Sequence, residues 1–151
     1  MLSRVMLLLI GVVMVGLSAC SADSSSSGKR WYSSAQVELG RAVFENNCAQ
    51  CHGQQAQGLV KDWKRRLPDG SLPPPPLNGT AHAWHHSLPL LLEIVQQGGA
   101  LYDGKMPGFE DRLSEAEQSA AIAWFQSFWS DEIYEFWQDT NNRMQQQGGR
   151  P

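Results

Sequence analysis

A run of five residues, CAQCH at positions 48–52, limits what this chain of 151 residues can fold into more than any other feature. Cys48 and Cys51 stand about one helical turn apart, so their side chains lie on the same side of the backbone. His52 follows at once, and a neutral imidazole is a common metal ligand. The run therefore predicts a compact site with two sulfur atoms and one imidazole.

Three kinds of site contain two cysteines at this spacing, and they differ in what else they need. A thioredoxin-like redox pair belongs to a βαβ unit, but no strand pattern precedes Cys48. Structural zinc needs a second pair of ligands, and a histidine cluster in segment 82–86 is the only remaining source. Covalent attachment of haem needs the motif, its histidine and an exported chain. Because the chain carries an export signal, we expect one haem c with thioethers to Cys48 and Cys51 and its iron bound by His52.

Residues 1–19 predict a signal peptide rather than part of the fold. Arg4 precedes an apolar run, Val5–Leu17, that carries no charge and is short for a membrane span. The run leads into LSAC at positions 17–20, which resembles the bacterial lipobox, so we expect lipid on Cys20. The alternative is a plain signal peptide that is cut elsewhere.

Residues 20–33 are polar and rich in serine, and such a stretch predicts a flexible tether. Lipid on Cys20 and two thioethers would use all three cysteines, which leaves no free thiol in an oxidising compartment. We therefore expect a lipid-anchored protein on the periplasmic side of a bacterial membrane, with the choice between inner and outer membrane open. A formal net charge of −3 gives no support to a nucleic-acid partner.

Residues 34–129 resemble the class I cytochromes c, and the resemblance depends on four matches in the family's order. In chain order these are Gly40 with Phe44, the CAQCH run, the segment PPLNG at 75–79, which resembles a P-x-L-x-G loop, and KMP at 105–107 before a last helix with Trp124 and Phe125. The resemblance implies an all-α cytochrome c fold, in which three main helices and loops wrap around one covalently bound haem.

The resemblance also implies two further site residues. The carbonyl of the loop proline, here Pro75, accepts the second ring hydrogen of the axial histidine, although four consecutive prolines leave this register open by one residue. Met106 is expected to be the sixth iron ligand. It lies in a glycine-flanked loop before Pro107, whereas Met144, the other methionine beyond the signal, lies in a Gln-rich tail. The alternative is a loop methionine that only packs against apolar groups.

Three histidines before the middle helix, His82, His85 and His86, are rival iron ligands. We expect them on the surface or near the haem propionates, where the resembling family usually places contacts from this segment. The sequence leaves open whether one of them contacts the haem. Trp84, which lies between them, can donate its indole hydrogen to a propionate or can fill the core.

Apolar spacing predicts three main helices within a domain of residues 34–130. Their signals, in chain order, are an N-cap at Ser34 with an apolar stripe through Leu39, a start at Ser87 with a stop at Gly98–Gly99, and the capping box SEAE at 114–117. The small Gly40 would let the first and last helices cross closely. No stretch alternates at period two for long enough to predict a strand.

The sequence predicts less about the structure of residues 131–151. Residues 131–144 predict an extra helix with Ile133, Phe136 and Trp137 on one face, which either caps the core or serves a partner. Residues 145–151 are expected to be disordered.

These features together predict a one-electron carrier rather than an enzyme, because two protein ligands on the iron leave no position for a substrate. Its partners would be redox proteins, held near the same membrane as the lipid-anchored chain. The basic loop 61–66 is either solvated surface or a docking patch for an acidic partner. Two other functions stay open: a ligand-reactive, peroxidase-like haem enzyme, and a haem-bearing accessory subunit of a larger oxidoreductase.

Overall fold

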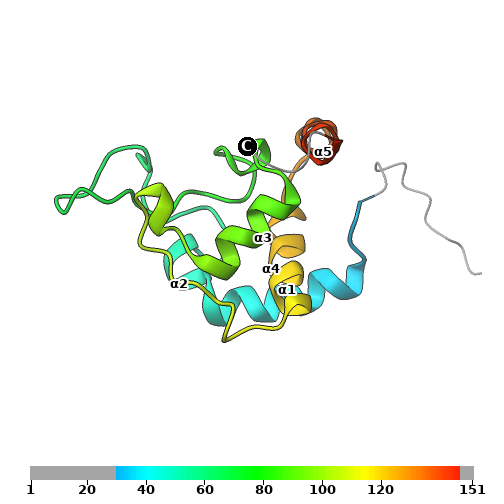
Figure 1. Cartoon of the computed structure of the whole chain (residues 1–151), viewed down its shortest axis with the longest axis horizontal. Coiled ribbons are helices and arrows are strands. Elements are labelled where there is room, and N and C mark those ends of the chain that lie inside the picture. Colours follow the sequence, from blue (N-terminus) through cyan, green and yellow to red (C-terminus); the bar gives the residue numbers. More distant parts are fainter. Residues whose placement is uncertain (1–29, 147–151) are drawn as a thin grey trace, which may run out of the picture.

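A computed structural model describes residues 30–146 of the protein (Figure 1). This part of the chain contains helices and no strand, which confirms the predicted all-α fold class. In chain order the elements are α1 (Ser34–Asn47), α2 (Ala49–His52), the 3-10 turn η1 (Ala83–His85), α3 (Leu88–Gln97), the 3-10 turn η2 (Ala100–Tyr102), α4 (Glu115–Gln126) and α5 (Asp131–Gln146). The predicted signal peptide, the lipidation at Cys20, tether residues 20–29 and tail residues 147–151 lie outside the described part.

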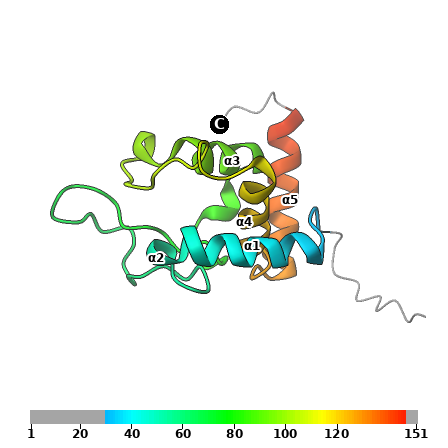
Figure 2. The ribbon, with the colours of Figure 1, turned by 90° about the horizontal axis from the view of Figure 1, so that it is seen from below.

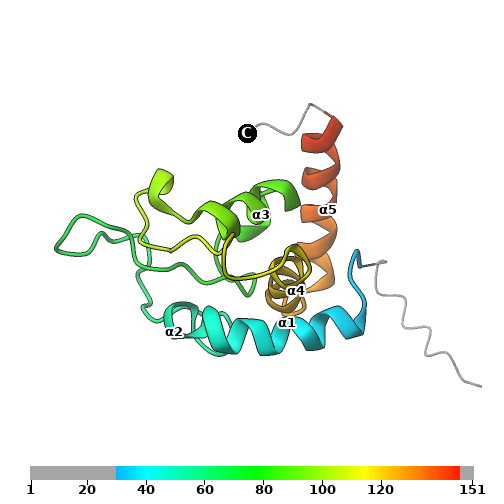
Figure 3. The same cartoon turned by 60° about the horizontal axis from the view of Figure 1, so that its bottom comes forward.

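The three predicted main helices are α1, α3 and α4, and the closest crossing is that of α1 with α4. Figure 3 shows α4 nearly end-on where it passes over α1. Gly40 lies at this crossing, since a Cβ atom on it would come within 1.9 Å of the Ala120 carbonyl oxygen. A side chain at position 40 would push the two helices apart, so the predicted role of Gly40 is confirmed.

The helix starts agree with the sequence at α4 and differ by one residue at α1. Ser114 and Glu117 form the predicted capping box, in which the Ser114 amide donates to the Glu117 carboxylate at 2.9 Å. At α1 the N-cap is Ser33 rather than Ser34, and Gln36 completes a capping box. Ser33 is the cap because Gln36 stands three residues after it, which is the spacing that a capping box needs.

The start of α3 depends on a residue far away in the sequence. The helix follows Ser87 as predicted, but the Ser87 side chain makes no capping hydrogen bond. The Leu88 amide donates instead to Asn141 Oδ1 of α5 at 2.8 Å. Gly98, with φ of +88°, ends the helix as predicted.

The core is built mainly from α1, α4 and α5. Its largest side chains are Phe44, Ile122, Phe125, Trp129, Tyr134 and Trp137. Leu39, which was predicted on the buried stripe of α1, is 44% exposed, because the face that meets α4 runs through Gly40, Val43 and Phe44.

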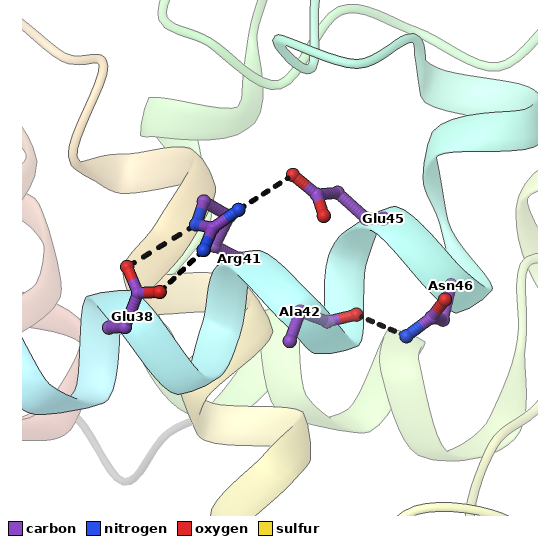
Figure 4. Close-up of polar contacts among 5 residues, drawn as sticks. All are labelled: Glu38, Arg41, Ala42, Glu45 and Asn46. Atoms are coloured by element: carbon purple, nitrogen blue, oxygen red, sulfur yellow. Dashed lines mark hydrogen bonds and ion pairs between the residues drawn. The ribbon is translucent and has the colours of Figure 1, made fainter.

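The outer face of α1 is charged and faces solvent. Arg41 lies between Glu38 and Glu45, at 2.5 Å and 3.4 Å from their carboxylates (Figure 4). The guanidinium holds the pKa of Glu38 below its usual value. Exposed ion pairs of this kind contribute little to stability.

The extra helix α5 caps the core at the end of the molecule away from α2 (Figure 2). It extends to Gln146, two residues beyond the predicted end. Tyr134 and Trp137 are each 1% exposed, while Phe136, which was predicted to share the inner face, is 49% exposed. The inner face therefore follows Tyr134, Trp137 and Asn141, with Ile133 partly buried against the core as predicted, and Phe136 lies outside it.

The segment before α1 is fastened to α5. Arg30 Nη2 donates to Asp131 Oδ1 at 2.6 Å, and the Trp31 amide donates to the Tyr134 hydroxyl at 2.8 Å. Residues 30–33 were expected in the tether, but these contacts make Arg30 and Trp31 part of the folded unit. None of the helices between residues 30 and 146 is both long and apolar enough to cross a bilayer.

Candidate haem-binding site

The CAQCH run lies where α1 turns into α2. Cys48 is the C-cap of α1, and Cys51 and His52 lie in α2. Cys48 is half-buried and Cys51 is exposed, and both are free thiols. His52 is buried, with 7% of its surface exposed. Two thiols on one turn beside a buried imidazole are the groups that a covalent haem site needs.

The electrostatics of the thiols argue against a thioredoxin-like redox pair. Burial, and to a smaller extent the neighbouring Cys51, raise the pKa of Cys48 to about 11. A reactive cysteine of such a pair needs a lowered pKa, because the thiolate is the nucleophile. Residues 30–146 also contain no strand that could belong to a βαβ unit.

His52 makes one ring hydrogen bond, in which Nδ1 donates to the carbonyl oxygen of Pro75 at 2.9 Å. A carbonyl only accepts, so Nδ1 carries the hydrogen and Nε2 keeps its lone pair in the neutral ring. Burial lowers the pKa of His52 more than this hydrogen bond raises it, which favours the neutral ring. Of the four consecutive prolines, Pro75 is thus the one whose carbonyl meets the histidine.

The proline segment is anchored at Leu77, two residues after Pro75. The Leu77 amide donates to the Ala56 carbonyl at 2.7 Å, and the Leu77 carbonyl accepts from the Trp129 indole at 2.7 Å. The sequence carried no signal of this bond, because Leu77 and Trp129 are 52 residues apart.

Met106 lies in the loop between η2 and α4. Its carbonyl accepts from the Gly99 amide at 3.0 Å. Two glycines allow the loop to pack on the end of α3: a Cβ atom on Gly98 would lie 2.6 Å from the Met106 oxygen, and one on Gly108 would lie 2.5 Å from the Gln96 oxygen. The backbone of the loop is therefore fixed, and ligation of iron by the Met106 sulfur stays a prediction.

Arg66, from the predicted basic loop, is engaged within the protein. Its Nη2 donates to Asp103 Oδ2 at 2.8 Å, three residues before Met106. Close by, Lys105 pairs with Asp69. These contacts join the loop that follows the CAQCH run to the Met106 loop. A docking role for the other basic residues stays a prediction.

The histidine cluster does not form a metal site. Within residues 30–146 no group of three or more His, Cys, Asp or Glu side chains could hold a metal ion, so the zinc alternative lacks its ligands. His82 stacks on Trp63 with ring centroids 4.8 Å apart, and His86 meets His82 edge-on at 5.1 Å. Burial lowers the pKa of both His82 and His86.

Trp84 is half-buried and packs against other rings. It stacks on His85 at 3.8 Å and meets Phe136 of α5 edge-on at 5.2 Å. These contacts favour the core-filling interpretation, and a hydrogen bond from Trp84 to a haem propionate stays a prediction.

The donor set fits a covalently bound haem. Cys48 and Cys51 supply two free thiols on one turn, and His52 presents a neutral ring whose other nitrogen is already engaged. The carbonyl of Pro75 orients that ring, which is the arrangement found around metal-bound histidines in general.

Comparison with known proteins points to the same kind of site. A family model described as cytochrome C oxidase, cbb3-type, subunit III matches residues 35–125. No curated protein and no solved structure matches the chain. The matched region contains α1, the CAQCH run, α3 and nearly all of α4, and it ends before Trp129 and α5.

Proposed function

The chain belongs to the family of cytochrome c oxidase cbb3-type subunit III, and we propose that it carries one covalent haem c and transfers single electrons between redox proteins. The observation that carries this proposal is the buried His52, oriented by Pro75 and placed directly after the second of two free thiols. Haem bound at this site supplies an iron that alternates between the ferrous and ferric states, which is one-electron chemistry.

Each residue of the site has a separate task in this proposal. Cys48 and Cys51 form the two thioethers, and His52 binds the iron through Nε2. The Pro75 carbonyl keeps the imidazole oriented and makes it a more basic ligand. Met106 is the sixth ligand, and its thioether raises the reduction potential relative to a second imidazole.

The proposal includes a membrane tether. Lipid on Cys20 would confine the protein to the periplasmic side of a membrane and raise its effective concentration around membrane-bound donors and acceptors. Arg30, the first described residue, bonds to Asp131 of α5, and α2 lies at the other end of the described part of the molecule (Figures 2 and 3). This arrangement supports an orientation in which the tether leaves the haem end free for a redox partner.

The family description favours a second function, that of a haem-bearing subunit which stays within a membrane oxidase complex. A subunit and a mobile carrier use the same site residues but differ in their association. Stoichiometric copurification with a larger oxidoreductase would identify the subunit, whereas turnover of the isolated chain with several partners would identify the carrier.

The test is expression of the full chain in an exporting bacterium with haem-maturation enzymes, followed by visible spectra and a pyridine haemochrome assay. We expect one haem per chain that stays attached after denaturation. Cys48→Ala and Cys51→Ala should each lose a thioether and most of the folded holoprotein. Gln50→Ala is the matched control, because Gln50 is an exposed residue of the same motif and should keep a normal yield.

Two results would contradict these assignments. A colourless protein with both motif thiols titratable would overturn the haem proposal. Rapid binding of cyanide or carbon monoxide by the native protein would show an open sixth position, and the peroxidase-like function would then replace electron transfer.

A further inference from the structure

Trp129 reaches from the junction of α4 and α5 to the segment that orients His52. The indole is 3% exposed, and its Nε1 donates to the Leu77 carbonyl at 2.7 Å. Leu77 lies two residues after Pro75, whose own carbonyl accepts from His52. A residue outside the matched family region therefore contacts the short segment that determines the direction of the imidazole.

The proline segment is held by the burial of Pro73 and Pro76 and by the hydrogen bonds of its neighbours, such as the Leu72 amide, which donates to the Asp103 carbonyl at 3.1 Å. Residues 73–76 are all proline and have no amide hydrogen, so they donate no backbone hydrogen bonds. Leu77 is the first residue after them that donates, to the Ala56 carbonyl at 2.7 Å. Both backbone groups of Leu77 are thus engaged, one by the loop after His52 and the other by Trp129.

Trp129 is itself supported by α5. Its ring lies 5.9 Å from that of Trp137, which is 1% exposed. A Cβ atom on Gly79 would lie 3.2 Å from Trp129 and 3.3 Å from Ile133, so the proline segment and α5 enclose the indole. Any shift of Trp129 would have to move these neighbours, because cores are close-packed.

We propose that Trp129 is a positioning residue for His52. Its hydrogen bond to the Leu77 carbonyl holds the proline segment so that the Pro75 carbonyl stays within hydrogen-bond distance of His52 Nδ1. Helix α5, in turn, holds Trp129 in place. The inference rests on the proposed function, in which His52 is the iron ligand. A carbonyl on Nδ1 makes imidazole more basic, which favours the ferric state and lowers the reduction potential. Loss of the Trp129 contact should therefore raise the potential.

Trp129→Phe tests this in the full-length holoprotein, because it keeps an aromatic ring in the core and removes the indole donor. The phenyl ring is also smaller than the indole, so a second Trp→Phe variant is needed as a control for the lost volume. We expect a more positive reduction potential by redox titration. In the reduced protein we also expect the His52 Nδ1 proton to exchange about fivefold faster by NMR, which is the order of effect of one buried hydrogen bond. The chain offers a control in Trp31→Phe, since Trp137 belongs to the support of Trp129. The Trp31 indole donates to Gln126 Oε1 at 2.6 Å and makes no hydrogen bond to the proline segment.

The outcomes separate this inference from the proposed function. An unchanged potential and exchange rate in haem-loaded Trp129→Phe, or equal changes in Trp31→Phe, would overturn the positioning role while the haem assignment stands. A wild-type protein without haem would overturn the proposed function itself.

A measurement on the wild-type protein covers the case in which Trp129→Phe does not fold. The Trp129 Nε1 and His52 Nδ1 protons should exchange through one opening event, with the same dependence on denaturant concentration. Exchange of the His52 proton through a smaller opening that leaves the Trp129 proton protected would overturn the inference.

Discussion

His52 and Met106, the two proposed iron ligands, are held in different ways. His52 is buried and its side chain is oriented by a hydrogen bond to the Pro75 carbonyl. Met106 is held through its backbone carbonyl, which accepts from the Gly99 amide at 3.0 Å. The fold therefore depends less on the side chain of Met106 than on the side chain of His52.

Met106→Ala should lower the reduction potential, because a soft thioether that favours the ferrous state is replaced by water or by a harder ligand. It should also increase the affinity for cyanide by about tenfold or more, since the sixth position no longer has to be vacated first. Both are measured on the holoprotein by redox titration and ligand titration. Met144→Ala, in α5, is the control and should leave both values unchanged. If Met106→Ala keeps the wild-type spectrum and potential, another group is the sixth ligand.

At the scale of elements, the crossing of α1 and α4 has the least room for change. Gly40→Ala would raise the intrinsic helix propensity by up to about 1 kcal/mol. The new methyl group, however, would meet the Ala120 carbonyl at 1.9 Å. Overpacking of this kind typically costs about 1–3 kcal/mol of stability. A net loss of stability in Gly40→Ala would therefore show that overpacking is the larger effect, and a net gain would show that helix propensity is.

We expect Gly40→Ala to destabilise the holoprotein by about 2 kcal/mol or more in guanidinium unfolding followed by circular dichroism. Ala42→Gly, at an exposed position of the same helix, measures the propensity effect alone and should cost about 1 kcal/mol. A Gly40→Ala protein at least as stable as the wild type would show that the helices do not cross this closely.

At the scale of the whole molecule, residues 30–31 and helix α5 lie at the same end. Arg30 and Trp31 bond to α5, which lies opposite α2 (Figure 2). An anchor attached before Arg30 would therefore connect to the α5 end of the molecule, away from the site residues in α2. Attachment to a membrane and the chemistry of the site should then be separable.

Cys20→Ser should release the protein from the membrane fraction without changing its visible spectrum or reduction potential, because Cys20 is not among the residues proposed to hold the haem. Fractionation of cells that express the full chain gives the readout. Ser24→Ala, in the same serine-rich segment, should stay with the membrane. Continued membrane association of Cys20→Ser would point to another anchor.

The features that the sequence predicted well depend on residues close together in the chain. The CAQCH turn, the Ser114 capping box and the stop at Gly98 each involve a few neighbouring residues, whose spacing alone defines the geometry. The same reasoning also explains a small error: Ser33 and Ser34 are adjacent serines, and only the position of Gln36 distinguishes them.

Contacts between residues far apart in the chain could not be predicted from local spacing. The sequence narrowed the histidine's partner to a run of prolines, but the packing of that segment decides that it is Pro75. Asn141 at the start of α3 and Trp129 on Leu77 are 53 and 52 residues from their partners. Such pairs depend on how the helices pack as whole bodies, which local spacing does not encode.

The sequence alone determined the helical class of this protein and predicted a set of site residues, because short motifs specify chemistry and local helix geometry. The tertiary structure decided which carbonyl orients His52, which face of α5 is buried and where the folded unit begins. Each of these depends on which apolar surfaces meet after folding. On α5, Tyr134 is buried in place of Phe136 because it packs against Arg30 and Trp31, which are about a hundred residues away in the sequence.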